Sequence, residues 1–188
     1  MAKYKLIACN VFQRELCAAI SDSPNVIDPE FLELGLHENS GKLGTRLQAK
    51  IDEASAASDG AWAAAPSGQT HDATVGAYDA ILLGYGLCGN GLAGIQARSL
   101  PLVLARAHDC CTILLGSRAA FLEKFGQNMS AGWSSAGYIE RGSTYFRASE
   151  VGTTTGNGRK FFLLISGKVV PLAWALIASI EVKAQLRT

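Results

Sequence analysis

The sequence carries little net charge and has no apolar run long enough to span a membrane without interruption. The formal charge is +1, and charged residues make up 18% of the 188-residue chain. Such a balance provides neither a basic stripe for nucleic acid nor an acidic tail, so we expect no nucleic-acid partner. Lys168 divides the apolar stretch 161–182 into pieces of roughly ten and fourteen residues, whereas a membrane span needs about 20. We therefore expect no membrane insertion.

The sequence also lacks the cysteine patterns of disulfide-rich and zinc-finger proteins. Its five cysteines form an odd, irregular set without C-x-x-C spacing. No secretory leader precedes Lys3, so we expect a reducing compartment and a cytoplasmic location. The thiols are then core residues, metal ligands or nucleophiles, and we expect Cys17 and Cys111 in the core.

Short apolar runs alternate with helical patterns along the chain. This alternation predicts an α/β protein with an open, mostly parallel, doubly wound sheet flanked by helices. Ser40, Asp109 and Ser117 are expected helix N-caps, and Gly126 is an expected stop. The strands are expected at 4–10, 30–34, 80–83 and 100–104, and the helices at 12–20, 43–54, 111–115 and 118–125.

The length suits one domain, so we expect residues 1–188 to form a single α/β domain. Residues 58–77 are rich in Ala, Gly, Ser and Thr, which predicts a loop or insertion. Residues 143–188 are expected to form a divergent carboxyl-terminal extension. Within it, strands are predicted around 161–170 and a closing helix from Pro171.

Thiols follow three of the predicted strands. Cys9 ends the first strand, Cys88 follows the third, and His108 and Cys110 follow the fourth as an H-x-C pair. Because parallel strands end at one shared edge, these residues from remote segments are expected to meet there. Thiolate and imidazole donors suit Zn²⁺ or another thiophilic metal, and the shortage of carboxylates disfavours Mg²⁺ and Ca²⁺. If only three donors bind, the fourth position is open to water or a thiol substrate.

A dinucleotide site for NAD or FAD is a second, less favoured interpretation. Gly84, Gly86 and Gly89 match G-x-G-x-x-G directly after a strand, and Asp109 follows about 20 residues later. Gly94 weakens the helix that should hold the pyrophosphate. The glycines otherwise allow the backbone to approach another ligand closely.

Other residues of this edge have alternative roles. Asn90 is a candidate pocket residue, and Arg106 is either an anion ligand or a solvated strand end. Cys110 stands at a helix start beside His108, where a thiol pKa is lowered, so a nucleophilic cysteine remains an alternative. The thiols and His108 also fit ordinary packing, and no residue is assigned a catalytic role.

Several stretches resemble one uncharacterised bacterial and archaeal family, the domain-of-unknown-function family DUF1638. The resemblance spans roughly residues 3–142 and is carried by residues 6–10, 35–37, 78–91 and 101–117. It implies a cytoplasmic α/β protein with a Cys/His site. The resemblance supplies no established reaction. Its members are similar in setting to proteins of corrinoid-linked methyl metabolism, so a metal-dependent transferase with thiol-activating or methyl-transfer chemistry, a corrinoid protein partner and a small-molecule or thiol substrate are one expectation. A non-catalytic metal carrier or structural protein is the alternative. We also expect a homo-oligomer, although no motif fixes the number of subunits.

Overall fold

The computed structural model describes residues 1–63, 77–129, 133–141 and 163–165, and its centre is a four-stranded parallel sheet. The strands are β1 (Lys3–Cys9), β2 (Val26–Leu32), β3 (Ala80–Gly84) and β4 (Leu102–Leu104), in the order β2-β1-β3-β4. Every neighbouring pair is parallel. All five residues of β3 are buried, as expected of a central strand covered on both faces.

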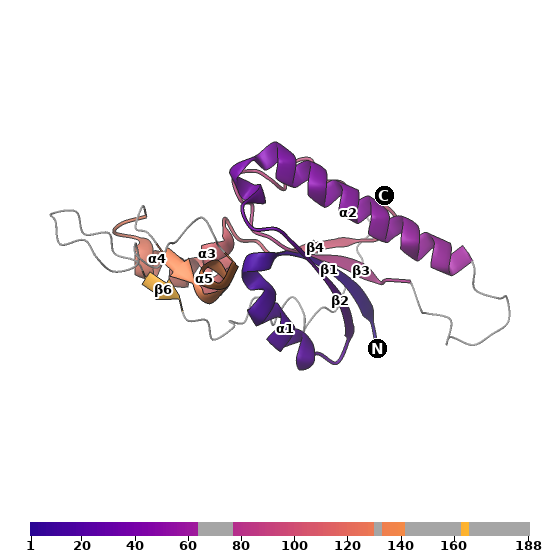
Figure 1. The fold of residues 1–188 in the computed structure, drawn as a ribbon, viewed down its shortest axis with the longest axis horizontal. Helices are drawn as coiled ribbons and strands as arrows, with labels where there is room; N and C mark the ends of the chain where they lie inside the picture. Colours follow the sequence, from indigo (N-terminus) through magenta and orange to yellow (C-terminus); the bar gives the residue numbers. More distant parts are fainter. Residues whose placement is uncertain (64–76, 130–132, 142–162, 166–188) are drawn as a thin grey trace.

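Helices cover both faces of this sheet, which confirms the predicted open α/β fold. The short helix η1 (Asn10–Phe12) leads into α1 (Gln13–Ser21), and η2 (Leu36–Glu38) precedes α2 (Ser40–Ala63). Figure 1 shows α1 on one face of the sheet and α2 along the other. Leu43, Leu47 and Ile51 recur at helical spacing in α2 and are fully buried against the sheet.

The remaining described elements form a second group beyond the carboxyl ends of the strands (Figure 1). They are α3 (Cys110–Leu115), α4 (Arg118–Phe125), β5 (Trp133–Ser135), α5 (Ala136–Arg141) and β6 (Leu163–Ile165). Asp109 caps α3 by accepting from the Thr112 amide, and Ser117 caps α4 by accepting from the Ala120 amide, both as predicted. The β5–α5 segment was not anticipated from the sequence.

Several element boundaries correct the sequence-based expectations. The second strand begins at Val26 and contains Pro29. Proline has no amide hydrogen, but β2 lies at the edge of the sheet, where one side of the strand has no neighbouring strand to accept a hydrogen bond. Helix α2 continues to Ala63 and includes the first residues of the loop expected at 58–77. Its cap is Asn39 and not Ser40, because the Asn39 side chain accepts from the Lys42 amide at 3.0 Å.

Cys17 is a further correction, because its side chain is exposed. The buried face of α1 carries Leu16 and Ala19, and Cys17 lies on the side turned to solvent. Cys111 is fully buried in the core, as predicted.

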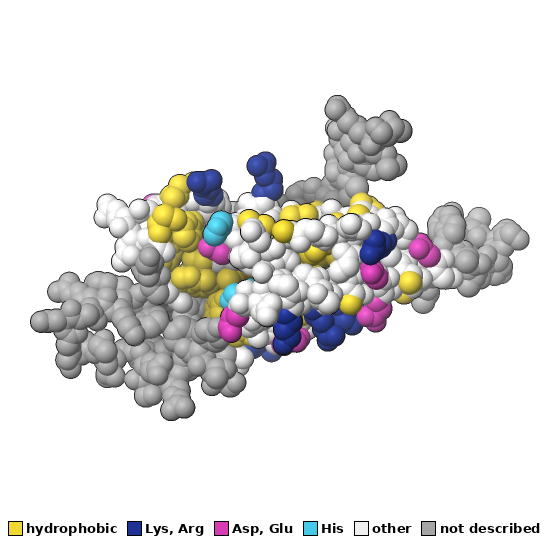
Figure 2. All heavy atoms as spheres, turned by 90° about the horizontal axis from the view of Figure 1, so that it is seen from above, with side chains coloured by type: hydrophobic (Ala, Val, Ile, Leu, Met, Phe, Trp, Pro, Cys, Tyr) yellow, Lys and Arg dark blue, Asp and Glu magenta, His cyan; other side chains and the backbone are white. Residues whose placement is uncertain are grey.

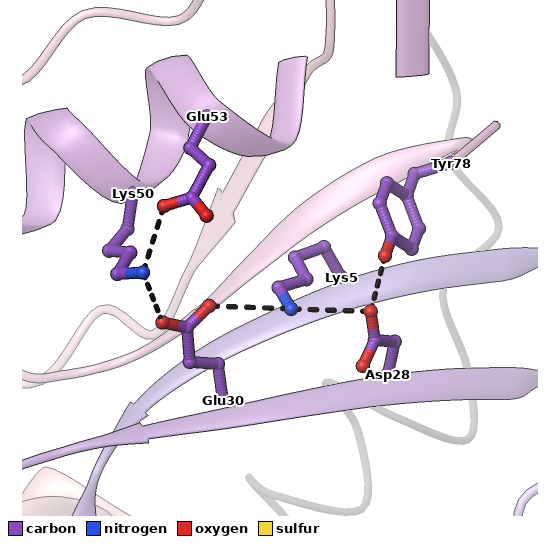
Figure 3. A network of polar contacts seen from close by, with 6 residues as sticks. All are labelled: Lys5, Asp28, Glu30, Lys50, Glu53 and Tyr78. Carbon is purple, nitrogen blue, oxygen red and sulfur yellow. Dashed lines mark hydrogen bonds and ion pairs between the residues drawn. The ribbon is translucent and has the colours of Figure 1, made fainter. Parts of the chain in front are cut away.

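A network of ion pairs fastens α2 to the edge of the sheet (Figure 3). Lys5 of β1 lies 3.2 Å from Asp28 and 3.3 Å from Glu30, both on β2. Lys50 of α2 reaches Glu30 at 2.7 Å, and the hydroxyl of Tyr78 donates to Asp28. The Lys5 side chain is only 15% exposed, so its ion pairs with Asp28 and Glu30 lie in the layer between α2 and the sheet.

No helix among the described residues is both long and apolar enough to cross a membrane. The apolar stretch 161–182 lies outside the described residues apart from β6. The predicted strand near 168–170 and the closing helix from Pro171 also lie outside them.

Candidate thiol site at the carboxyl edge of the sheet

The strand order reverses direction between β1 and β3. From β1 the chain crosses through α1 to β2 on one side, and from β2 it crosses through α2 to β3 on the other. In open parallel sheets, ligands bind outside the carboxyl ends of the two strands that flank such a reversal. The residues that follow Cys9 and Gly84 are therefore the first place to look for a site.

Three cysteines gather at this edge, and we call Cys9, Cys88 and Cys110 the three-thiol cluster. Burial, together with the charge of Cys110, raises the pKa of Cys9 to about 11. The pKa of Cys88 is raised to about 11 by burial and by the charge of Cys9. That of Cys110 is raised to about 12 by burial and by the charge of Cys88. Each thiol thus lies near enough to another to oppose its ionisation.

The turn that carries Cys88 has an unusual backbone. Cys88, Gly89 and Asn90 have φ values of 45°, 64° and 68°, in the left-handed region. Two of these residues are not glycine, and non-glycine residues in this region cost free energy. Strained backbone of this kind concentrates at ligand-binding sites, where the surrounding fold holds it in place.

Backbone contacts hold this turn against the loop that precedes α3. The Leu87 amide donates to the Ala107 carbonyl at 2.9 Å, and the Cys88 amide donates to the His108 carbonyl at 3.0 Å. A Cβ at Gly86 would lie only 2.8 Å from the backbone of Asp109. Gly86 is therefore required for the close approach that brings Cys88 to Cys110.

Helix α5 adds a tyrosine that the sequence did not indicate. The Tyr138 hydroxyl lies 3.2 Å from the Cys110 sulfur, and its ring meets Trp133 edge to face at 5.2 Å. Gly137 makes this possible, because a Cβ there would lie 1.8 Å from the Val11 carbonyl oxygen. A glycine before an aromatic residue was the only sequence signal, and it is too common to identify a site.

Buried polar atoms without partners lie in the same region. The Tyr85 hydroxyl and the Asn10 carboxamide oxygen are buried with no hydrogen-bond partner among the described residues. Tyr85 directly follows β3, and Asn10 directly follows β1. Unpartnered buried polar atoms are rare in folded proteins, and they often mark the position of a ligand or water.

The other candidate residues lie around the cluster and not within it. The His108 side chain is 83% exposed with Nδ1 3.5 Å from Asp109, and Arg106 is exposed. Gly84 is the last residue of β3 and faces Ala8. Asn90 lines a hollow of about 670 Å³ between its turn and the first half of α2, at residues 40–52.

Seen from the α2 side, the molecule is hollowed near the start of that helix. Figure 2 shows an apolar floor between α2 and the second group of elements, with histidine side chains at two places beside it. His37 and His108 are the histidines of the described residues.

The glycine motif lacks the helix that a dinucleotide site requires. Residues 88–94 form turns, and no helix occurs anywhere in 85–101. The first helix after the motif is α3, which begins at Cys110. The glycines thus lack the adjoining helix N-terminus that binds pyrophosphate.

Within the described ranges, no three His, Cys, Asp or Glu side chains are arranged to hold a metal ion as they stand. The donor types of the three-thiol cluster nevertheless fit a thiophilic ion, because thiolates are the ligands that Zn²⁺ and similar metals prefer. Binding would require the thiols to turn about their side-chain torsions and to lose their protons.

Comparison with known proteins gives the family but no activity. Residues 31–163 match the family described as "Protein of unknown function (DUF1638)". Neither a curated protein nor a solved structure matches the chain. The matched range covers more than half of the chain and includes Cys88 and Cys110, whereas Cys9 precedes it. The chain therefore belongs to the DUF1638 family.

Proposed function

We propose that the protein binds one thiophilic metal ion, zinc first among them, through the three-thiol cluster. The observation that carries this proposal is the meeting of Cys9, Cys88 and Cys110 from three remote segments at the reversal point of the sheet.

The electrostatics of the cluster support a cationic ligand. Burial and mutual repulsion keep the three thiols protonated in the absence of a cation. A bound divalent ion supplies the opposite charge and favours the thiolates, so metal uptake should release protons. Near Cys110, the Tyr138 hydroxyl is placed to donate a hydrogen bond to the thiolate sulfur.

Three thiolates leave one position of a tetrahedral ion open. Such an ion keeps a bound substrate thiol deprotonated or polarises a bound water. We therefore extend the proposal to a thiol-activating transferase whose substrate is a small thiol. The cytoplasmic location and the corrinoid protein partner that the family resemblance implies belong to this proposal.

Elemental analysis of the purified protein and its cysteine variants tests metal binding. We expect one equivalent of metal in the wild type and its loss in Cys9→Ser, Cys88→Ser and Cys110→Ser, because each variant removes one thiolate. Cys17→Ser is the matched control, since this thiol is exposed on α1. It should retain the metal. Equal metal content in all five proteins would reject the three-thiol cluster as the site.

A further inference from the structure

Two thiols at the carboxyl edge of the sheet, Cys88 and Cys110, lie on main-chain segments that contact each other. The Cys88 amide donates to the His108 carbonyl at 3.0 Å. Two residues earlier, a Cβ at Gly86 would lie only 2.8 Å from the backbone of Asp109, the residue before Cys110. A disulfide requires its Cα atoms within about 7 Å of each other, so direct contact between the two main chains is the arrangement that such a bond needs.

The two sulfur atoms also lie beside the same backbone amide. Burial raises the pKa of Cys88 to about 11, although the nearby amide of Cys110 lowers it in part. Burial and the charge of Cys88 raise the pKa of Cys110 to about 12, although the same amide lowers it in part. An amide that stabilises either thiolate must be close to both sulfurs. The two sulfurs are therefore neighbours.

Small molecules in solution can reach this pair more easily than the third thiol of the cluster. Cys88 and Cys110 are both partly exposed, whereas Cys9 is only 6% exposed. Cys88 also stands between Leu87 and Gly89, two exposed residues of its turn. A reagent that reacts with the cluster should therefore meet Cys88 first.

We propose that Cys88 and Cys110 form a reversible disulfide by exchange with a low-molecular-weight disulfide. The Cys88 sulfur attacks one sulfur of the small disulfide and releases the other as a thiol. The Cys110 sulfur then attacks the Cys88 sulfur in this mixed disulfide and releases the second small thiol. The two protein thiols lose two electrons and two protons, and the small disulfide gains both in becoming two thiols. In a reducing compartment such a bond is transient and follows the local redox state.

This inference goes beyond the proposed function, because it needs two adjacent thiols and no metal ion. The bond would also remove two of the three proposed metal ligands, so the experiment uses the full chain with metal removed by a chelator. Because burial keeps both thiols protonated, exchange is slow at neutral pH. The protein is therefore brought to equilibrium in glutathione buffers at mildly alkaline pH. Acid quenching, alkylation of the remaining thiols and mass spectrometry of the peptides then identify each oxidised cysteine.

Mass action distinguishes the proposed disulfide from simple attachment of glutathione. Each glutathione disulfide that forms the intramolecular bond releases two glutathione molecules, whereas a mixed disulfide on the exposed Cys17 releases one. A tenfold dilution of total glutathione should therefore lower the disulfide-to-thiol ratio at half oxidation about tenfold for Cys88 and Cys110. For Cys17 this ratio should not change.

Cysteine variants and peptide mapping identify the pair. Cys88→Ser and Cys110→Ser should each lose the crosslink. Cys17→Ser is the matched control and should retain it, since its thiol lies on α1. Peptide mapping of the oxidised wild type makes the same assignment without a variant, so the test does not depend on the folding of any variant.

Three results would overturn the inference. The first is glutathione attached to Cys88 at equilibrium while Cys110 stays a free thiol, because the two sulfurs then cannot meet. The second is modification of Cys17 alone, with Cys88 and Cys110 both reduced. The third is a crosslink that joins Cys9 to either of them. Metal content is measured separately on the reduced protein, so none of these outcomes decides the proposed function.

Discussion

Replacing Glu15 with glutamine should stabilise the protein at neutral and alkaline pH. Glu15 lies on α1 with only 6% of its surface exposed, and one carboxylate oxygen has no partner among the described residues. Burial raises the pKa of Glu15, and the nearby charge of Glu140 raises it further. Arg14 and Arg141 act in the opposite direction, but Arg14 is already paired with Glu140 at 2.7 Å.

The magnitude follows from the buried charge. A buried polar group left unpaired costs about 1–3 kcal/mol, and the neutral amide avoids the larger part of this cost. We therefore expect Glu15→Gln to raise the free energy of unfolding by about 1 kcal/mol at pH 8, or Tm by about 2–4 °C.

The gain should depend on pH with a definite sign. Because the folded-state pKa of Glu15 is raised, ionising this carboxyl destabilises the native state. That cost is complete above the folded-state pKa and disappears as the pH falls below the unfolded-state value of about 4.3. The difference between Glu15→Gln and wild type should accordingly vanish near pH 4.

Urea unfolding at pH 8 and pH 4 measures both effects. Glu123→Gln is the control, because Glu123 is an exposed glutamate on α4. It should change stability little at either pH. A Glu15→Gln variant that is less stable than wild type at pH 8, or whose gain is equal at both pH values, would refute the buried-charge explanation.

Two further substitutions test other parts of the structure. Lys5→Met removes the cation shared by Asp28 and Glu30 and should lower the free energy of unfolding by about 1–2 kcal/mol at pH 7 in urea titrations. Burial opposes the ionisation of Asp28 and Glu30, but their hydrogen-bond and charge partners lower the pKa of each carboxyl overall. The loss of stability should therefore shrink as the pH falls through the folded-state pKa values of the two carboxyls. A loss that stays constant with pH would argue against the ion pairs. Tyr138→Phe should weaken Zn²⁺ binding about 10–100-fold in a competition titration with a chelator, because it removes the donor to the Cys110 sulfur. Unaltered affinity would remove Tyr138 from the site.

Much of the sheet could be predicted from local patterns. The apolar runs at 80–83 and 100–104 are short and bounded by Gly or Pro, which favours buried parallel strands. Since such strands end at one edge, the topology indicated that edge as the place for a site, and the role of its thiols stays a prediction. The caps at Asp109 and Ser117 were predictable because their side chains serve the first helical turn locally.

Features that depend on long-range packing could not be predicted. Tyr138 reaches Cys110 only because Gly137 lets α5 approach η1, a contact between segments remote in sequence. Local backbone geometry decides the placement of His108, whose carbonyl accepts from Cys88 while its ring remains exposed. Cys17 was wrongly expected in the core. Neighbouring residues on a helix point in directions about 100° apart, so the residue next to a buried one can face solvent.

X-ray absorption at the metal edge of the zinc-loaded protein tests the three-thiol cluster most directly. Coordination by Cys9, Cys88 and Cys110 predicts a first shell of three sulfurs at about 2.3 Å and one lighter or exogenous ligand. A shell made only of nitrogen and oxygen at about 2.0–2.2 Å would contradict the proposed site.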